Sequence, residues 1–289
     1  MLTKKYVYGS LALAVMLACG SAQAKDTKHI DASTEDYNSA DDVNYTGDVN
    51  YGIYATAGKT VNLTGKNINF TISGSEATDY VGAFSKATGG IGGGLINLGG
   101  ENTQNITLNV TNTSDSDSDA TGIWVHRKND TGTKPSKTVV TSKNLTINAY
   151  SENGSAVGLW VQNSTIPDNL DEKGKDEGRS TVIINAENTV INVSSGITEA
   201  GESGEYKSKG IVNYSQGKVE INNNLTINAG TAISTRGYAE TKINEDGKGT
   251  VKINGDISFN VTHDGNSGLV ANSTVNIKLT NKDSYLNGN

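Results

Sequence analysis

Four aromatic residues are the side chains of this sequence best suited to binding a partner. Tyr54, Phe84, Trp124 and Trp160 each follow a glycine by two positions, and an aliphatic or small residue stands on either side of each ring. If those flanking residues point into a core, the four rings point outward along one face and form an aromatic column. An exposed apolar strip often marks an interaction site. We therefore expect this column to bind a glycan or a protein surface.

The opposite facing of the rings is the alternative. A shift of one residue along each strand would bury all four rings and expose the aliphatic side chains beside them. The small residues Ala55, Ala83 and Ala271 suit a crowded interior, so they favour the outward facing of the rings.

Other candidate sites are weaker. Asp115-Ser-Asp-Ser-Asp119 resembles the first half of a calcium loop, but Ala120 replaces the glycine of the tight turn and His126 replaces the bidentate glutamate. The run Gly89-Gly-Ile-Gly-Gly-Gly94 lacks the lysine of a phosphate loop and the aspartate of a calcium repeat, so a turn is expected there. The three histidines are scattered along the chain, at His29, His126 and His263. No metal and no cofactor is expected.

Catalytic chemistry is not expected either. Enzymes that cleave acidic sugars need clustered carboxylates with Arg or Lys on adjacent strands. The expected strands carry Thr, Asn, Ser and Lys instead, and the chain has only three arginines, Arg127, Arg179 and Arg236. A polysaccharide lyase or hydrolase remains the enzymatic alternative.

Short repeated strands must position the rings. Asn144-Leu-Thr-Ile-Asn-Ala149 alternates apolar and polar residues, as a strand with one buried face does, and it recurs identically at Asn224–Ala229. Looser copies begin at residues 67, 105, 188 and 256. A second type of strand precedes each copy, as in Thr60-Val-Asn-Leu63 and Thr250-Val-Lys-Ile253, and the glycine–aromatic strand follows it. Each repeat therefore contributes three strands.

The repeat predicts a solenoid. The copies are 38, 39, 44, 36 and 32 residues apart, and repeats of this length made only of strands are typical of solenoids and propellers. Equivalent strands keep their residue types from repeat to repeat, which suits parallel stacking of like on like. We expect an all-β fold, a parallel, right-handed β-helix of about seven three-stranded coils over residues 51–289, with the last coil incomplete.

The first 50 residues differ from the repeat. Residues 1–24 have a basic start at Lys4 and Lys5, an apolar stretch, and Ala22-Gln-Ala24 before Lys25, which together indicate a secretory signal peptide. Lipidation of Cys19 is the alternative. Residues 25–50 are polar and acidic, and we expect a leader or an N-terminal cap.

Composition narrows the possible partners. Cys19 is the only cysteine, so the mature chain would have no disulfide. Removal of the signal leaves 22 basic and 31 acidic residues, a net charge of −9. The absence of a basic stripe argues against nucleic acid as a partner, and no later apolar run is long enough to span a bilayer.

Together these features resemble the passenger region of bacterial autotransporters and related β-helix adhesins. The resemblance covers about Tyr51 to Leu279 and rests on the signal peptide, the lack of cysteine and the repeated Asn-Leu-Thr-Ile and Gly-Ile strands. It implies a protein at the cell surface, associated with the outer membrane or extracellular, which acts as an adhesin or binding scaffold toward a host or neighbouring cell. A structural stalk for another domain is the alternative.

Complete autotransporters end in a translocator barrel, whereas this sequence stops at Asn289. We expect either a fragment or another export route. The last coil would then leave an open strand edge through which the chain could self-associate.

Overall fold

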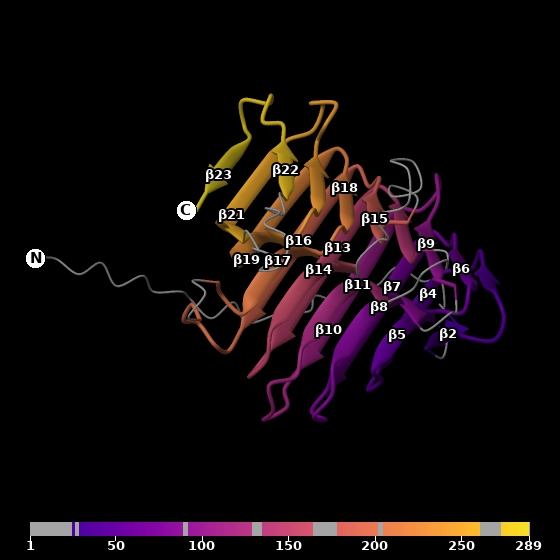
Figure 1. Cartoon of the computed structure of the whole chain (residues 1–289). Coiled ribbons are helices and arrows are strands. Elements are labelled where there is room, and N and C mark those ends of the chain that lie inside the picture. The colour runs from indigo at the N-terminus through magenta and orange to yellow at the C-terminus, as the bar shows by residue number, and fades with distance from the viewer. Residues whose placement is uncertain are drawn as a thin grey trace, which may run out of the picture.

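The computed structural model describes residues 25–26, 29–88, 92–128, 135–163, 178–201, 205–260 and 273–288 (Figure 1). None of these residues is helical, and all their strand ladders are parallel. The predicted signal peptide, Cys19, His263, Ala271 and part of the Gly89–Gly94 run lie outside the described residues.

The strands stack in three rows. The first row is an eight-stranded sheet made of β3 (Tyr37–Ser39), β6 (Thr60–Leu63), β9 (Leu95–Gly99), β12 (Lys137–Thr141), β15 (Thr181–Ile184), β18 (Lys218–Ile221), β20 (Glu240–Ile243) and β22 (Thr274–Ile277). The second row contains β1 (Lys25–Asp26), β4 (Val43–Gly47), β7 (Asn67–Gly74), β10 (Asn105–Asn112), β13 (Asn144–Ser151), β16 (Asn188–Ser195) and β23 (Tyr285–Asn287). The third row contains β2 (Ile30–Ala32), β5 (Tyr51–Ala55), β8 (Tyr80–Thr88), β11 (Ala120–Lys128), β14 (Ala156–Asn163) and β17 (Ser208–Tyr214).

Two long strands belong to both the second and the third row. They are β19 (Asn224–Arg236) and β21 (Val251–Asn260), and they join the two rows into one fifteen-stranded sheet. Each coil contributes one strand to the eight-stranded sheet: seven of these strands lie within residues 51–289, as predicted, and the eighth, β3, belongs to a further coil formed by residues 25–50. The predicted parallel β-helix is confirmed.

The structure places two segments differently from the sequence analysis. Thr250-Val-Lys-Ile253 was expected in the first row, but Val251 pairs with Leu225 in the second row, and the first-row strand is Glu240–Ile243. Ile257 pairs with Ile233, so the segment starting at Asp256 lies in the third row rather than the second. The cause is that β19 and β21 pass from one row to the next without a loop, which shortens the repeat and offsets its pattern.

Residues 25–50 add a coil at the N-terminal end. β2, β3 and β4 pair in parallel with β5, β6 and β7. Ile30, Ala32 and Val43 are buried and extend the core cluster, although most of their neighbours in the sequence are polar. These few apolar residues are enough to form the core of this coil, because each of its short strands has only one or two residues that point inward.

Alternation of residue types explains the core. Along β13, Leu145, Ile147 and Ala149 are buried while the residues between them are only partly buried. Equivalent Leu, Ile and Val side chains from successive coils stack into one continuous cluster. Burying such side chains is worth roughly 1.5–3 kcal/mol each.

Two asparagine ladders run along the outside of the second row. In each ladder the side-chain amide of one coil donates to the amide oxygen of the preceding coil, over 2.8–3.1 Å. One ladder joins Asn67, Asn105, Asn144, Asn188 and Asn224, and the other joins Asn109, Asn148, Asn192, Asn228 and Asn254.

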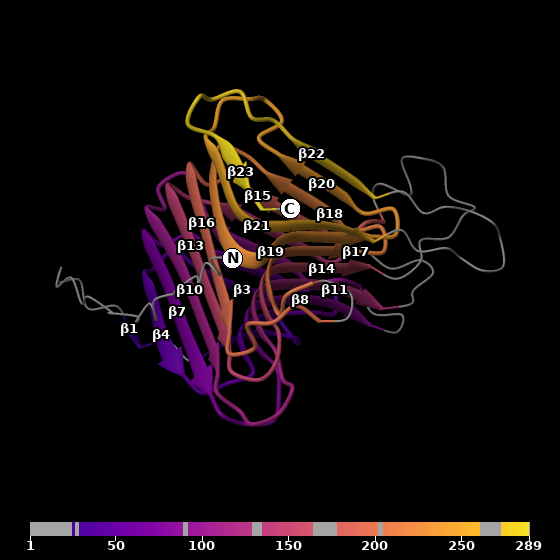
Figure 2. The same ribbon diagram turned by 90° about the vertical axis from the view of Figure 1, so that its left-hand side faces the viewer.

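A column of glycines sets the angle between the second and third rows, which Figure 2 shows meeting at a bend. A Cβ atom added to Gly122 would lie 2.2 Å from Cγ2 of Ile147, and one on Gly158 would lie 2.3 Å from Cγ2 of Ile191. A Cβ atom on Gly52 would lie 2.4 Å from Cδ1 of Ile72, and one on Gly210 would lie 2.5 Å from Cγ2 of Ile227. Only glycine permits the two rows to approach this closely.

Within the described chain, no helix is long and apolar enough to cross a membrane.

Candidate functional site

The four predicted aromatic residues occupy equivalent positions in successive third-row strands. Tyr54 pairs with Phe84, Phe84 with Trp124, and Trp124 with Trp160. Their sequence neighbours are buried on the core side, as Ile123 and Val125 are on either side of Trp124. The rings therefore point away from the core, which is the outward facing expected from the sequence.

The rings stack on one another. Phe84 and Trp124 have centroids 4.5 Å apart, Trp124 and Trp160 have centroids 4.9 Å apart, and each pair is inclined by 13°. Tyr54 packs on Phe84 at 5.7 Å with a tilt of 47°. Neighbouring rings in such a column gain about 0.5–1.5 kcal/mol beyond the area they bury.

Stacking changes what the column offers to a ligand. Phe84 is only 2% exposed although it faces outward, because its neighbours cover it. Trp124 and Trp160 are partly exposed, but their Nε1 atoms are buried and find no hydrogen-bond partner in the described structure. The faces of the middle rings are occupied by other rings, so they present mainly edges to solvent.

Tyr51 is a fifth member that the sequence analysis missed. Its ring lies 5.3 Å from Tyr54 with a 21° tilt and 5.1 Å from Phe84. Tyr51 precedes the crowded Gly52, where the third-row strands depart from simple alternation, so period-two counting does not place it beside Tyr54. The only feature of the sequence that could have indicated Tyr51 is its position directly before Gly52, at the start of the first strand with the glycine–aromatic pattern.

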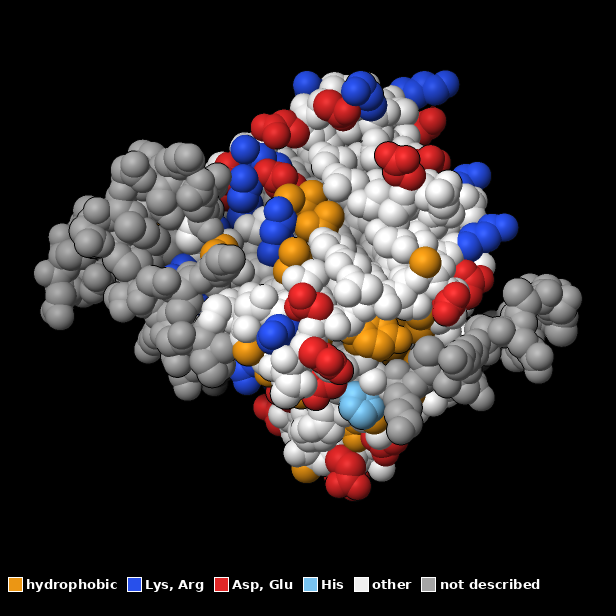
Figure 3. All heavy atoms as spheres, turned by 90° about the vertical axis from the view of Figure 1, so that its right-hand side faces the viewer, with side chains coloured by type: hydrophobic (Ala, Val, Ile, Leu, Met, Phe, Trp, Pro, Cys, Tyr) orange, Lys and Arg blue, Asp and Glu red, His pale blue; other side chains and the backbone are white. Residues whose placement is uncertain are grey.

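A pocket of about 450 Å³ opens at the N-terminal end of the column. Asp31 lies in register with Tyr54 and continues the column by one residue. The pocket is lined by His29, Asp31, Asp48, Val49, Asn50, Tyr51 and Tyr54. Burial raises the pKa of the Tyr51 hydroxyl, as do the neighbouring Tyr54 and the charge of Asp79. Figure 3 views this end of the molecule and shows hydrophobic side chains near its centre with acidic side chains below them.

The other end of the column is covered by the chain itself. Trp160 pairs with Val212, which pairs with Ser234, and both residues are buried. Glu205 lies over this part, where it accepts a 2.7 Å hydrogen bond from Ser234 and pairs with Lys209 at 2.6 Å. Burial acts to raise the pKa of Glu205, but the hydrogen bonds from Lys209 and Ser234 outweigh it and hold the pKa below its usual value.

A row of polar and aromatic residues, with a lysine at one end and an arginine at the other, borders the column. Lys86, His126, Gln162, Tyr214 and Arg236 are in register along the neighbouring outward positions. The Lys86 ammonium lies 5.6 Å from the Phe84 ring centroid, and the Arg236 guanidinium lies 3.9 Å from that of Tyr214. Both distances fit cation–π contacts.

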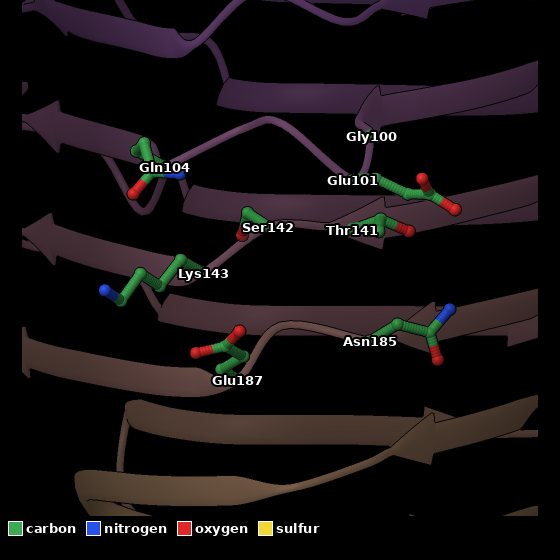
Figure 4. Close-up of a pocket in the computed structure, with 8 residues that line it drawn as sticks. All are labelled: Gly100, Glu101, Gln104, Thr141, Ser142, Lys143, Asn185 and Glu187. Atoms are coloured by element: carbon green, nitrogen blue, oxygen red, sulfur yellow. The ribbon is translucent and has the colours of Figure 1, made fainter.

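A second hollow of about 450 Å³ lies at the corner between the first and second rows (Figure 4). Glu101, Thr141 and Asn185 point to one side of it and Gln104, Lys143 and Glu187 to the other, so its polar groups do not converge on one point. It has no aromatic residue among those that line it. We assign it no role.

The segment that resembles half of a calcium loop, Asp115–Asp119, forms a turn that is stabilised by hydrogen bonds among neighbouring serine side chains. Its serine hydroxyls hydrogen-bond one another, Ser114 to Ser116 at 3.0 Å and Ser116 to Ser118 at 2.6 Å. Burial raises the pKa of Asp119, and so do the charges of Asp79 and Asp117. No group of three His, Cys, Asp or Glu side chains in the described residues is arranged to hold a metal ion.

The pocket beside Tyr51 and Tyr54 is thus the place where an aromatic surface, carboxylates and open space coincide. Comparisons of the chain with protein-family models, with curated proteins and with solved structures found no match.

Proposed function

We propose that this chain is an exported, surface-displayed binding scaffold, similar in role to the passenger of an autotransporter adhesin. Its partner is a glycan or protein of a host or neighbouring cell. The observation that carries this proposal is the pocket at the N-terminal end of the column. There the rings of Tyr51 and Tyr54 line open space, and no further aromatic ring of the described chain packs against them on that side.

The rest of the column supports binding as an extended edge. Trp124 and Trp160 are partly exposed and aligned along the helix axis. A partner seated in the pocket could therefore continue along several coils. Aromatic residues with one apolar and one polar end are frequent anchors at binding surfaces.

The close stacking favours a second candidate, a structural stalk. Phe84 is almost fully covered, and the stack adds contacts between successive coils. In that case the column stiffens the solenoid and binds nothing. Substitutions at the pocket separate the two candidates, because the pocket rings lie at the end of the stack.

The test compares the double variant Tyr51→Ser/Tyr54→Ser with Tyr238→Ser, a control tyrosine that is 44% exposed and has no part in the column. The probes are a panel of immobilised neutral, acidic and amino-sugar glycans, and whole epithelial cells. We expect the double variant to lose binding while its melting temperature stays within a few degrees of the control. Unchanged binding by the double variant would favour the stalk.

Export is tested on the same full-length chain in a bacterial host. We expect the exported protein to begin at Lys25, as read by N-terminal sequencing, and to be found outside the inner membrane. A product that retains residues 1–24 would contradict this, and one that begins at a lipidated Cys19 would support the lipidation alternative.

A further inference from the structure

We propose that the pocket at the N-terminal end of the column recognises a protonated amino group, and that its ligand is a glycan carrying free amino sugars. This rests on the proposed binding function and deepens it by naming the ligand chemistry.

The pocket combines the two features that attract an organic cation. The stacked Tyr51 and Tyr54 rings offer electron-rich aromatic surface, which attracts ammonium groups within about 6 Å of a ring centroid. Asp31 and Asp48 add two carboxylates to the same wall. A neutral sugar would gain from the rings alone, whereas an amino sugar gains from the rings and from the charges.

The carboxylates are available to a ligand. Both are exposed, and neither forms an ion pair with a basic residue in the described part of the chain. The buried Tyr80 hydroxyl hydrogen-bonds Asp48 and so fixes its position. The strand pairing of Asp31 with Tyr54 positions the backbone of Asp31 beside the rings.

The described side chains around the pocket are mainly negative, as binding of a cation requires. No lysine or arginine is among the described residues that line the pocket, and its one histidine is His29. Asp79 lies close enough to influence Tyr51 and adds further negative potential. Lys86 approaches the column only at Phe84, the next ring along. Among the described side chains that line the pocket, Asp31 and Asp48 would therefore attract a cation.

The size of the pocket favours a sugar over a bare ammonium group. A volume of about 450 Å³ is within the range of small-molecule sites. A lysine side chain would fill only part of it.

The experiment uses the full exported chain and two matched probes in calorimetric titrations, a glucosamine tetramer and its N-acetylated counterpart. Acetylation removes the positive charge and leaves the sugar ring. We expect the glucosamine tetramer to bind about tenfold more tightly, from one cation–π contact and exposed charge pairs. The preference should weaken at high salt.

The key variant is Asp31→Asn/Asp48→Asn. It should lose most of the preference for the glucosamine tetramer, because only the tyrosine rings then attract the ammonium group. The control is Asp41→Asn/Asp283→Asn, which removes the same charge at two exposed sites outside the pocket and should keep the preference. Circular dichroism and the melting temperature establish that all variants are folded.

Each other outcome overturns the inference in a recognisable way. Equal binding of the two tetramers by the unaltered chain would disprove the amino-group preference and leave the glycan scaffold intact. Binding of a lysine-rich peptide with neither tetramer bound would indicate a protein partner instead. If the tetramers do not bind and Tyr51→Ser/Tyr54→Ser keeps full binding to cells, the proposed site itself is wrong.

Discussion

The indole ring of Trp124 lies on that of Trp160, with 4.9 Å between centroids and 13° between planes, and neither Nε1 atom has a hydrogen-bond partner in the described structure. The pair thus gains from stacking while two buried donors go unsatisfied. A buried unpaired donor costs roughly 1–3 kcal/mol.

This relationship predicts different results for two substitutions of the same residue. Trp160→Phe keeps a stacking ring and removes an unpaired donor, so its free energy of unfolding should change by less than about 1 kcal/mol. Trp160→Ser removes the ring and should destabilise by about 2 kcal/mol or more. Urea denaturation at 25 °C measures both. Equal losses for Phe and Ser would mean that stacking contributes little.

The glycine column predicts a strong steric effect. Gly122→Ala would place a Cβ 2.2 Å from Ile147 and 2.7 Å from the Gly158 carbonyl oxygen, and should destabilise by about 2 kcal/mol or more. Gly100→Ala is the control, because its added Cβ would meet nothing closer than 3.8 Å, and a change within about 0.5 kcal/mol is expected. Thermal unfolding of both variants checks this. A stable Gly122→Ala variant would show that the bend can relax.

Glu205 predicts a pH-dependent contribution to stability. Its pKa is lowered in the fold from an ordinary value of 4.5, so the charged form is favoured and the contribution is complete above that pH. It is lost as the pH falls through the lowered pKa. Glu205→Gln should therefore destabilise by about 1–3 kcal/mol at pH 7, and the difference from the unaltered chain should shrink below pH 4.5. Urea midpoints at pH 7 and in acid test this, and a difference independent of pH would contradict it.

The last described strands predict self-association. Among the described strands, β22 pairs only with β20 and β23 only with β21, and Tyr285 and Leu286 are 43% and 48% exposed. An unpaired parallel edge with apolar side chains can pair with another chain. We expect sedimentation to show concentration-dependent oligomers that Leu286→Lys reduces and Tyr238→Lys does not. A strictly monomeric chain at high concentration would contradict this.

Repetition made much of the fold predictable from the sequence. Period-two alternation fixed the inward positions, and once Ile123 and Val125 point inward, Trp124 must point outward. Equivalent residues then stack because the coils are parallel. The first coil could not be predicted in this way, because Ile30, Ala32 and Val43 are few among polar residues. Residues 250–253 lie in a different row from the predicted one because β19 passes from the second row to the third without a loop.

The pocket could not be predicted in the same way. Asp31, Asp48 and Tyr54 come together only through the strand register between the first two coils, and that register was not visible while residues 25–50 were read as a leader or cap. The burial of Phe84 likewise depends on the distances between the neighbouring rings. Alternation in the sequence predicts which residues face outward but not how closely their side chains pack.

The asparagine ladders give the solenoid a direction. Every amide in them donates toward the N-terminal end, as Asn144 does to Asn105 and Asn188 does to Asn144. A coil that has already folded therefore presents a row of vacant acceptor oxygens to the coil that follows it, and those oxygens lie at the spacing that the next strand requires. Each folded coil therefore offers hydrogen-bond acceptors to the next coil in the sequence, which favours folding of the coils one after another from the N-terminal end.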